Sequence, residues 1–293
     1  MQAARQYYKF FIKILKKIGF VGGDADPCLM MRKNKDGVVY IAIWVDDSLL
    51  IGNEKAINAT IDDMKKEGLS LKIEGNLDDY LSCEISIDEK KKSGWIHQPH
   101  LIKKLEKKFG SMVEGLMEYK TPGTPHQTIT RDVAVKISDD DQKLYRSGVG
   151  MLLWLVKHSR PDIANAVREL TKVLDGASAA AMKEMLRTIK YVLDTKNYAL
   201  KMKPNFGAKN MWSMLAFCDS DYATDPDTRK SVSGFVLYLC GVPILWQSKG
   251  QKLVTLSRTK AEYISLLETA KEVKFVYKLL RSMGASVKLP ITI

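Results

Sequence analysis

The spacing of apolar residues changes along the chain between a helical period and the alternation that is typical of strands. Apolar positions three and four residues apart predict amphipathic helices at 3–18, 54–67, 101–109, 141–157, 162–174, 179–193 and 260–283. Short apolar or alternating runs predict strands at 28–31, 38–44, 69–74, 80–87, 95–98, 211–219, 233–239 and 242–247. Because strands and helices are both present in clusters, the pattern indicates the α+β fold class.

One predicted hairpin, residues 38–52, has an unusual tip. An apolar run that starts at Val38 ends in two adjacent carboxylates, Asp46 and Asp47, and a second apolar run follows them. Asp is a good turn former, so a plain type I turn would explain the pair. Carboxylate oxygens are also ligands of hard divalent ions, so a metal site at the tip of a buried hairpin would explain it too. The residues alone leave both interpretations open.

A segment rich in proline, glycine and threonine predicts a domain boundary. Thr121-Pro122-Gly123-Thr124-Pro125 excludes regular structure, and polar residues continue to Asp141. We therefore expect a first domain over 1–120, a linker over 121–141, a helical region over 142–205 and a further domain over 206–293. The predicted 260–283 helix could begin at Thr259, because Thr259-x-x-Glu262 has the form of a capping box.

Composition narrows the possible environments of the chain. The four cysteines lie far apart without metal-ligand spacing, which favours free thiols in a reducing compartment. Cys83, His97 and His100 likewise fit no zinc pattern. No apolar run approaches the roughly 20 residues that span a bilayer. Lysines interrupt the only apolar stretch near the N-terminus, so no signal peptide is expected, and we expect an intracellular chain.

The charge balance suggests a class of partner. The 293 residues carry a net charge of +12, and lysine provides most of the excess. A basic surface suits a polyanion, of which nucleic acid is the usual case. Solvated lysines on the outer faces of helices are the alternative, and the sequence does not choose between them.

Several motifs together resemble the Pol polyproteins of copia-type retrotransposons. The first group is Gln2-Ala3-Ala4-Arg5, Ala25-Asp26-Pro27-Cys28-Leu29 and Trp44-Val45-Asp46-Asp47-Ser48-Leu49-Leu50-Ile51-Gly52, which is similar to the region of the catalytic hairpin of the reverse transcriptase. The second is Tyr145-Arg146-Ser147 and Arg160-Pro161-Asp162-Ile163-Ala164, similar to the helical segment that follows. The third is Cys218-Asp219-Ser220-Asp221-Tyr222-Ala223, Trp246-x-Ser248-Lys249-x-Gln251 and Ala261-Glu262-Tyr263, similar to the family's ribonuclease H. The resemblance covers nearly the entire chain.

This resemblance implies a fold and a chemistry. It implies a partial reverse-transcriptase palm and thumb with a helical connection, followed by a truncated ribonuclease H-like α/β domain. It implies two-metal phosphoryl transfer with Mg²⁺ (or Mn²⁺), in which Asp46 and Asp47 serve the polymerase and Asp219 and Glu262 the ribonuclease. Arg160 and Arg168 are at most contacts to backbone phosphates. The implied partners are an RNA template, a DNA primer, an RNA–DNA hybrid and other Pol fragments, in a cytoplasmic virus-like particle or in the nucleus.

Some positions depart from the family pattern. Ser82 stands where the family has glycine, which leaves the backbone packing there open. Arg258 and Lys260 stand where the family has Ser and Glu, and two added cations beside a metal site would disfavour a divalent ion.

The family's remaining carboxylates for both sites fall outside the sequence, upstream of Gln2 and beyond the strand that Leu289 to Ile293 would open. We therefore expect a reverse transcriptase and ribonuclease H fragment that is inactive as an isolated chain. One alternative is a non-catalytic nucleic-acid-binding remnant. Another is a reading frame that yields no stable protein, because a sheet without its later strands leaves an unpaired edge.

Overall fold

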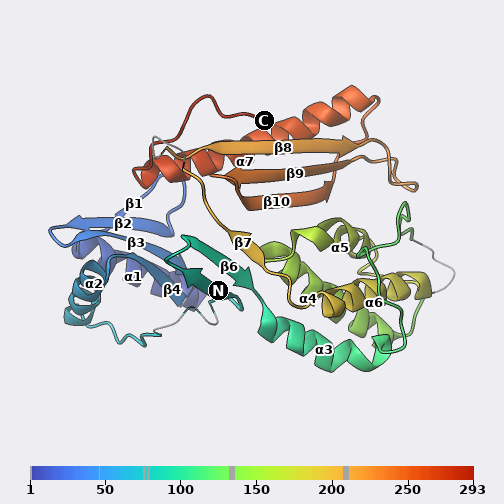
Figure 1. The fold of residues 1–293 in the computed structure, drawn as a ribbon, viewed down its shortest axis with the longest axis horizontal. Coiled ribbons are helices and arrows are strands. Elements are labelled where there is room, and N and C mark those ends of the chain that lie inside the picture. Colours follow the sequence, from blue (N-terminus) through green and yellow to red (C-terminus); the bar gives the residue numbers. More distant parts are fainter. Residues whose placement is uncertain (1, 46, 75–76, 78–79, 132–135, 207–210) are drawn as a thin grey trace. The chain divides into compact units, whose positions relative to one another are not determined.

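The computed structural model describes residues 2–45, 47–74, 77, 80–131, 136–206 and 211–293. It divides into two compact units (Figure 1). The first unit comprises Met1–Gly75 with Glu272–Lys288, and the second comprises Asn76–Lys271 with Leu289–Ile293. Each unit is described separately below. The predicted domain division at 120 and 141 follows other boundaries and stays a prediction.

The first unit packs helices on an antiparallel sheet. Its elements are α1 (Gln2–Lys17), β1 (Val21–Gly22), β2 (Leu29–Asn34), β3 (Gly37–Trp44), β4 (Asp47–Gly52) and α2 (Glu54–Lys66). The strands pair in the order β1-β2-β3-β4. The buried core consists of Phe11, Leu15, Phe20, Met30, Val39, Ile41, Ile43, Ala56 and Met64. The predicted helices at 3–18 and 54–67 and the hairpin at 38–52 are confirmed.

Local chemistry fixes the ends of both helices in this unit. After α1, Gly19 has φ +94°, and the amide of Phe20 donates to the carbonyl of Leu15 at 2.9 Å. This is the Schellman arrangement, in which glycine adopts the left-handed conformation without steric cost. Before α2, the side chain of Asn53 accepts a hydrogen bond from the amide of Ala56 at 2.8 Å, as an N-cap residue does.

The second unit contains a helical region with its own core. Its helices are α3 (Pro99–Val113), α4 (Asp139–His158), the short 3₁₀ helix η1 (Pro161–Ile163), α5 (Ala164–Thr171) and α6 (Ala179–Asp194). Apolar side chains from all of them meet in one cluster, which includes Leu105, Phe109, Tyr145, Leu152, Ile163, Val167, Met185 and Ile189. The methionines of α6 therefore belong to the core, as their helical spacing predicted.

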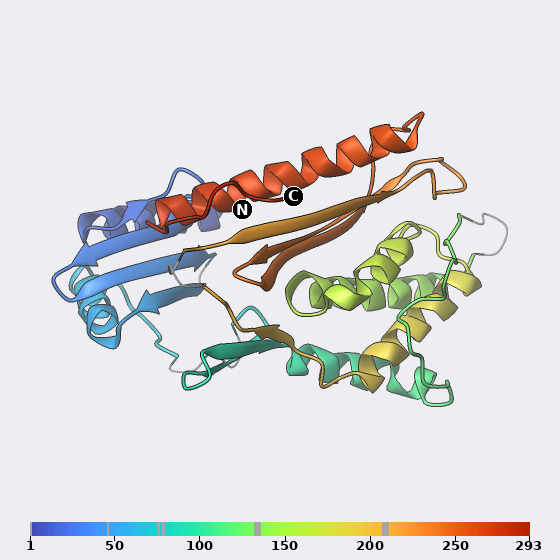
Figure 2. The ribbon, with the colours of Figure 1, turned by 45° about the horizontal axis from the view of Figure 1, so that its top comes forward.

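The second unit also contains two three-stranded antiparallel sheets. In one, β5 (Glu84–Asp88), β6 (Ser93–His97) and β7 (Leu200–Met202) pair in that order. In the other, β8 (Met214–Asp221), β9 (Val232–Leu239) and β10 (Val242–Gly250) pair in the order β10-β9-β8. Helix α7 (Arg258–Ser282) follows, and its first half runs along this second sheet (Figure 2). On the other edge of β8, Leu215 forms a parallel bridge with Thr292.

Two predicted strands differ from the structure. Residues 69–74 form no strand, because Leu69 and Leu71 pack against the first unit's core without pairing with a neighbouring strand. The predicted strand at 80–87 is reduced to β5, because Leu81 and Ser82 have φ of +54° and +64° and turn the chain. Ser82 is the residue that replaces the family's glycine, and a positive φ is where glycine would be favoured.

The segment predicted as a linker packs closely against the helices of its own unit. Ile129 is buried in the helical core, and the hydroxyl of Thr124 donates to Glu184 at 2.9 Å. Helix α4 starts at Asp139, before the predicted position, because Ser138 caps it by accepting from the amide of Asp141. Residues 132–135 of this segment lie outside the described residues.

The structure confirms the α+β class at the level of element content. Among the described helices, none combines the length and the apolar character that crossing a membrane requires.

Candidate functional site

The hairpin formed by β3 and β4 places the first predicted carboxylates. Trp44 lies opposite Asp47, so the hairpin turns between these two residues, and Val45 lies in the turn. Asp46 lies outside the described residues. Asp47 is exposed, and its carboxylate makes no hydrogen bond or ion pair with a described residue. The described part of the tip is therefore open to a cation from solvent.

The same loop carries backbone strain. Val45 has φ +55°, a conformation that a β-branched residue adopts only at a steric cost. Two-residue hairpin loops need such positive φ values, and Gly, Asn or Asp usually supply them. Val45 is also 61% exposed, so packing does not account for its presence. Such outliers gather at functional sites, which is a reason to examine this loop experimentally.

The second predicted pair lies in the second unit, where β8 presents Asp219. Burial alternates along β8, with Ala216 buried and Phe217 exposed, and Asp219 belongs to the exposed face. Asp219 lies opposite Gly234 of β9, which in turn lies opposite Ser248 of β10. Directly opposed residues share a face of the sheet. Asp219 therefore faces the side on which Ser248 contacts α5.

Helix α7 brings the second carboxylate, Glu262, to the same end of the sheet. The hydroxyl of Ser265 donates to the carbonyl of Asp219 at 2.7 Å, and the carbonyl of Gly234 lies 3.4 Å from the same hydroxyl. Glu262 precedes Ser265 by three residues, a spacing that places both on one side of a helix. Glu262 is exposed, and its carboxylate makes no hydrogen bond or ion pair with a described residue.

The capping-box interpretation of Glu262 is wrong. Helix α7 begins at Arg258, and its cap is Ser257, whose hydroxyl accepts from the amide of Lys260 at 3.3 Å. Thr259 therefore lies within the first turn and cannot serve as the N-cap. Capping no longer accounts for Glu262, and the metal-ligand interpretation stays a prediction.

The predicted site residues are of the type that binds Mg²⁺, but too few of them lie close together to hold the ion. Asp47, Asp219 and Glu262 offer exposed carboxylate oxygens, which hard divalent ions prefer. Among the described residues, no three His, Cys, Asp or Glu side chains are grouped closely enough to hold a metal ion. A two-metal centre needs several converging carboxylates, so the described residues provide only part of one.

A groove of about 640 Å³ begins beside the Asp219 site. Asp221, two residues further along β8 and therefore on the same face, lines it. The segment 121–129 and α5 form the other walls. Asp221 is not among the site residues predicted from the sequence, although the alternation along β8 that exposes Asp219 also exposes Asp221.

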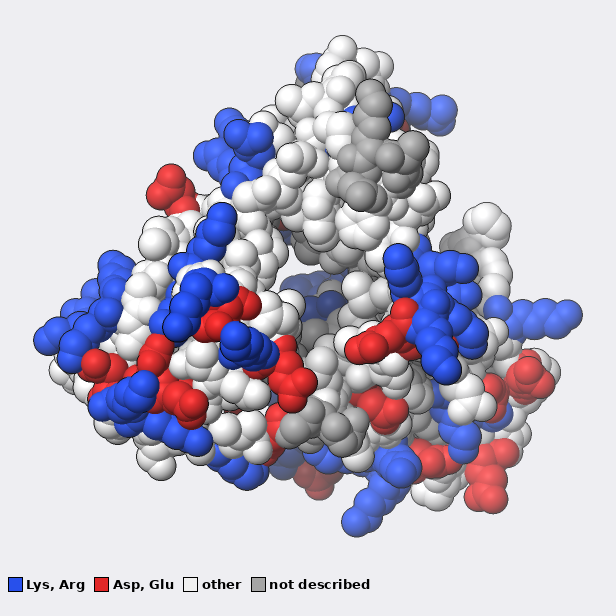
Figure 3. All heavy atoms as spheres, turned by 60° about the vertical axis from the view of Figure 1, so that its left-hand side comes forward, with Lys and Arg blue, Asp and Glu red and all other residues white. Residues whose placement is uncertain are grey.

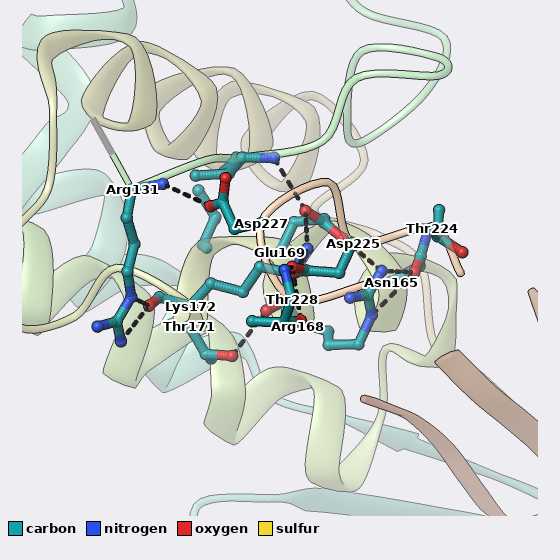
Figure 4. A network of polar contacts seen from close by, with 12 residues as sticks. Arg131, Asn165, Arg168, Glu169, Thr171, Lys172, Thr224, Asp225, Asp227 and Thr228 are labelled. Carbon is teal, nitrogen blue, oxygen red and sulfur yellow. Dashed lines mark hydrogen bonds and ion pairs between the residues drawn. The ribbon is translucent and has the colours of Figure 1, made fainter. Parts of the chain in front are cut away.

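A polar network joins α5 to the loop that follows β8 (Figure 4). The ammonium group of Lys172 lies 2.9 Å from Glu169 and 3.0 Å from Asp225. Arg168 pairs with Glu169 at 2.6 Å and donates to Ser248 of β10 at 3.1 Å. These side chains are largely buried, so they connect the helical region firmly to the β8–β9–β10 sheet. Sequence reasoning missed the network, because its members lie on segments far apart in the chain.

Asp225 is the most strongly perturbed carboxylate of this network. Burial would raise its pKa, but hydrogen bonds from the hydroxyl and amide of Thr228 and from Lys172 outweigh burial and lower the pKa to about 2. The side chain of Thr228 donates to Asp225 at 2.7 Å and its amide at 2.8 Å. The loop after β8 is therefore held by a carboxylate that stays ionised at neutral pH.

The phosphate-contact interpretation of Arg160 is wrong. Its side chain is only 2% exposed, and it donates to Asp162 and to the hydroxyl of Thr195 at 2.8 Å each. Its guanidinium also lies over the rings of Tyr191 and Tyr198. Arg160 therefore stabilises the helical region from within and is not accessible to a phosphate.

Comparison with known proteins identifies relatives along almost the whole chain. The chain is 27% identical over 292 residues to the retrovirus-related Pol polyprotein from transposon TNT 1-94 of Nicotiana tabacum, covering 98% of this chain and 22% of the relative. It is 29% identical over 290 residues to the Pol polyprotein from transposon RE1 of Arabidopsis thaliana, covering 99% and 19%. A putative transposon Ty5-1 protein of Saccharomyces cerevisiae is 27% identical over 260 residues, covering 88% of this chain and 82% of that protein.

The chain thus spans about a fifth of the length of the two Pol polyproteins. No protein-family model matches the chain. No solved structure matches it either. All three relatives are transposon proteins, as the motifs in the sequence predict. The chain is therefore a relative of the retrovirus-related Pol polyproteins of copia-type transposons.

Proposed function

We propose that this chain is a reverse transcriptase and ribonuclease H fragment of a transposon Pol polyprotein and acts on RNA–DNA duplexes. In this proposal, Asp46 and Asp47 serve the RNA-directed DNA polymerase, and Asp219 and Glu262 serve the hybrid-cleaving ribonuclease. The contact between Ser265 and the carbonyl of Asp219 supports it most directly. That contact joins the helix with one carboxylate to the strand with the other, on a sheet of three antiparallel strands.

The proposal includes a role for divalent ions. When bound, Mg²⁺ or Mn²⁺ stabilises the attacking and leaving oxygens of a phosphoryl transfer. The chain's own contribution is to hold Asp219 on a paired strand and Glu262 on a capped helix, with both carboxylates facing solvent. Because each pair provides only two carboxylates, we expect weak metal binding and turnover near background for the isolated chain. Other Pol fragments are the proposed source of further ligands.

Affinity cleavage by iron tests the proposed metal sites without requiring turnover. Fe²⁺ with ascorbate and peroxide produces radicals that cut the main chain beside a bound ion. We expect cuts near the end of β8 and the start of α7, and others at the β3–β4 loop. Asp219→Asn should abolish the first set and Asp47→Asn the second. The matched variant Glu118→Gln, which removes an exposed carboxylate elsewhere, should keep both sets.

A cutting pattern that survives Asp219→Asn and Glu262→Gln would contradict the ribonuclease assignment.

Assays of the two activities themselves are the second test. Purified chain with Mg²⁺ or Mn²⁺ is incubated with a primed RNA template and with a labelled RNA–DNA hybrid. Primer extension or hybrid cleavage well above background would show that the two carboxylates of that site suffice.

A non-catalytic nucleic-acid-binding role is the second candidate, and the surface of α3 favours it. Lys103, Lys104 and Lys107 are exposed and form no ion pair with a described residue. Lys103 and Lys107 are four residues apart and therefore neighbours on the helix surface. On the face drawn in Figure 3, lysine and arginine side chains lie among carboxylates. The exposed lysines of α3, which have no such partners among the described residues, are therefore candidate contacts for phosphates.

Salt dependence tests this binding role. The affinity of the chain for a labelled duplex should fall steeply as salt rises, because each neutralised phosphate releases counterions. Lys103→Ala/Lys107→Ala should reduce the slope of log K against log salt by about 2, roughly one for each lost phosphate contact. Lys91→Ala/Lys143→Ala removes two lysines that already pair with aspartates and should change the slope less. Binding that ignores salt, or no binding at low salt, would contradict the candidate.

A further inference from the structure

The side chain of Gln251, directly after β10, joins the sheet of the second unit to helix α7. It is 3% exposed. Its amide nitrogen donates to the hydroxyl of Ser233 in β9 and to the carbonyl of Ala261 in the first turn of α7, at 2.9 Å each. Because a carbonyl can only accept, the bond to Ala261 fixes the orientation of the Gln251 amide. The main-chain amide of Gln251 also donates to the carbonyl of Ser231, at 2.8 Å.

Contacts between the sheet and α7 flank Glu262 on both sides along the helix. Gln251 binds the carbonyl of Ala261, which is the residue before Glu262. Ser265, three residues after Glu262, donates to the carbonyl of Asp219 at 2.7 Å. Ala261 and Ser265 are both buried. The place of Glu262 relative to Asp219 therefore depends on both contacts, and Gln251 provides the one nearer the start of the helix.

The other end of the Gln251 contact lies beside Asp219. Ser233 is buried in β9 and precedes Gly234. Gly234 lies directly opposite Asp219 in the ladder between β8 and β9. Gln251 thus connects the residue before Glu262 to the residue next to the partner of Asp219. A single buried side chain relates the two carboxylates that the proposed ribonuclease site requires.

Packing does not account for a glutamine at this position. The side-chain oxygen of Gln251 is buried and makes no hydrogen bond with a described residue. A buried acceptor without a partner is destabilising, and methionine would fill a similar volume without that cost. What methionine lacks is the pair of amide hydrogens. The two hydrogen bonds that they make are therefore the reason for glutamine here.

We propose that Gln251 is a positioning residue of the ribonuclease site, whose amide hydrogens hold Glu262 in a fixed place relative to Asp219. The inference rests on the proposed function, because it takes these two carboxylates as ligands of one site. Gln251 is buried, so it acts through Ser233 and Ala261. Residues that orient metal ligands typically contribute roughly 10–100-fold to metal affinity. Loss of the Gln251 contacts should weaken ion binding at this site alone.

Iron cleavage of the full chain at increasing Fe²⁺ tests this role. The Fe²⁺ concentration for half-maximal cutting is measured separately for the cuts at β8 and α7 and for those at the β3–β4 loop. Gln251→Met keeps the volume and removes both donors, so it should raise the concentration at β8 and α7 about tenfold. Ser233→Ala removes one of the two acceptors and should raise it by about threefold. The concentration for the β3–β4 cuts should stay as in the unmodified chain.

Thr269→Val separates positioning from a general loss of stability. Thr269 is fully buried in α7, and its hydroxyl donates to the carbonyl of Ser265 within the same helix at 2.8 Å. Urea denaturation measures the stability of all the variants. Thr269→Val should lower stability and leave both iron concentrations unchanged.

Several outcomes would overturn the positioning role while leaving the proposed function intact. One is cutting by Gln251→Met at the same iron concentration as the unmodified chain, and another is an equal shift in Thr269→Val. If Gln251→Met does not fold, an unchanged concentration in Ser233→Ala overturns the role by itself. An unmodified chain without cuts at β8 and α7 would overturn the ribonuclease assignment and the positioning role together.

Discussion

At the scale of single residues, the structure changes the interpretation of Glu262. Ser257 and Thr259 are both residues that commonly cap helices, and the sequence does not reveal which one the helix uses. The structure selects Ser257, whose hydroxyl accepts from the amide of Lys260. Glu262 is then an exposed carboxylate in the interior of the helix, and capping does not explain it.

The two candidate caps predict different effects on stability. Ser257→Ala should lower the free energy of unfolding by about 1 kcal/mol, because an amide of the first turn loses its partner. Thr259→Ala should change it by only a few tenths of a kcal/mol, since alanine is favoured inside helices. Urea denaturation of both variants measures the difference. The reverse order of effects would show that Thr259 caps the helix.

The strained residue of the β3–β4 loop gives a second prediction. Val45→Gly should raise the free energy of unfolding of the first unit by about 1 kcal/mol, because glycine adopts φ +55° without steric cost. Val38→Gly, in the adjacent strand, should lower stability instead. Denaturation monitored within the first unit distinguishes the two. Destabilisation by Val45→Gly would mean that the valine side chain makes a compensating contact.

At the scale of elements, the long amphipathic helices could be predicted from sequence and the short strands could not. The periods of α1, α4, α6 and α7 extend over many residues, so the buried face is evident before any contact is known. The segment 69–74 is too short for alternation to be decisive, and its leucines are partly buried against the first unit's core without strand pairing. The predicted carboxylates of β8 and α7 could be read from motifs. The groove beside them could not, because its wall at 121–129 lies far upstream.

The network around Asp225 makes acid stability a test of how α5 is attached. The pKa of Asp225 is about 2 in the folded chain against an ordinary 3.8, so its contribution is complete above pH 4 and is lost as pH falls toward 2. This difference corresponds to about 2 kcal/mol at neutral pH. Asp225→Asn should lower stability at pH 7 by that amount and flatten the dependence between pH 4 and 2. Glu118→Gln should leave the acid dependence unchanged, and an unaltered profile in Asp225→Asn would contradict the assignment.

At the scale of the whole molecule, the first unit is assembled from distant parts of the sequence. The hydroxyl of Tyr40 donates to the carbonyl of Met283 at 2.8 Å, across a separation of 243 residues. The predicted division into consecutive domains could not anticipate this, because hydrophobic patterns describe local structure only. Each unit nevertheless has its own buried core.

Separate cores predict separate responses to cavities. Leu15 and Leu152 are both fully buried, one in each unit. Leu15→Ala and Leu152→Ala should each cost about 3 kcal/mol in the unit that contains the cavity. Hydrogen exchange measured residue by residue should show faster exchange mainly in that unit. Equal acceleration throughout the chain would show that the units unfold together.

The bridge between β8 and the last residues of the chain has a consequence during synthesis. The amide of Ala216 donates to the carbonyl of Thr292 at 3.0 Å, and this contact covers the open edge of β8. Thr292 is made roughly 75 residues after Ala216, which at about 5–20 residues per second takes roughly 4–15 s. During that interval the strand with Asp219 is complete but its edge is uncovered. Binding of a nascent chain by a chaperone, or pairing between neighbouring nascent chains, would compete with folding in that interval.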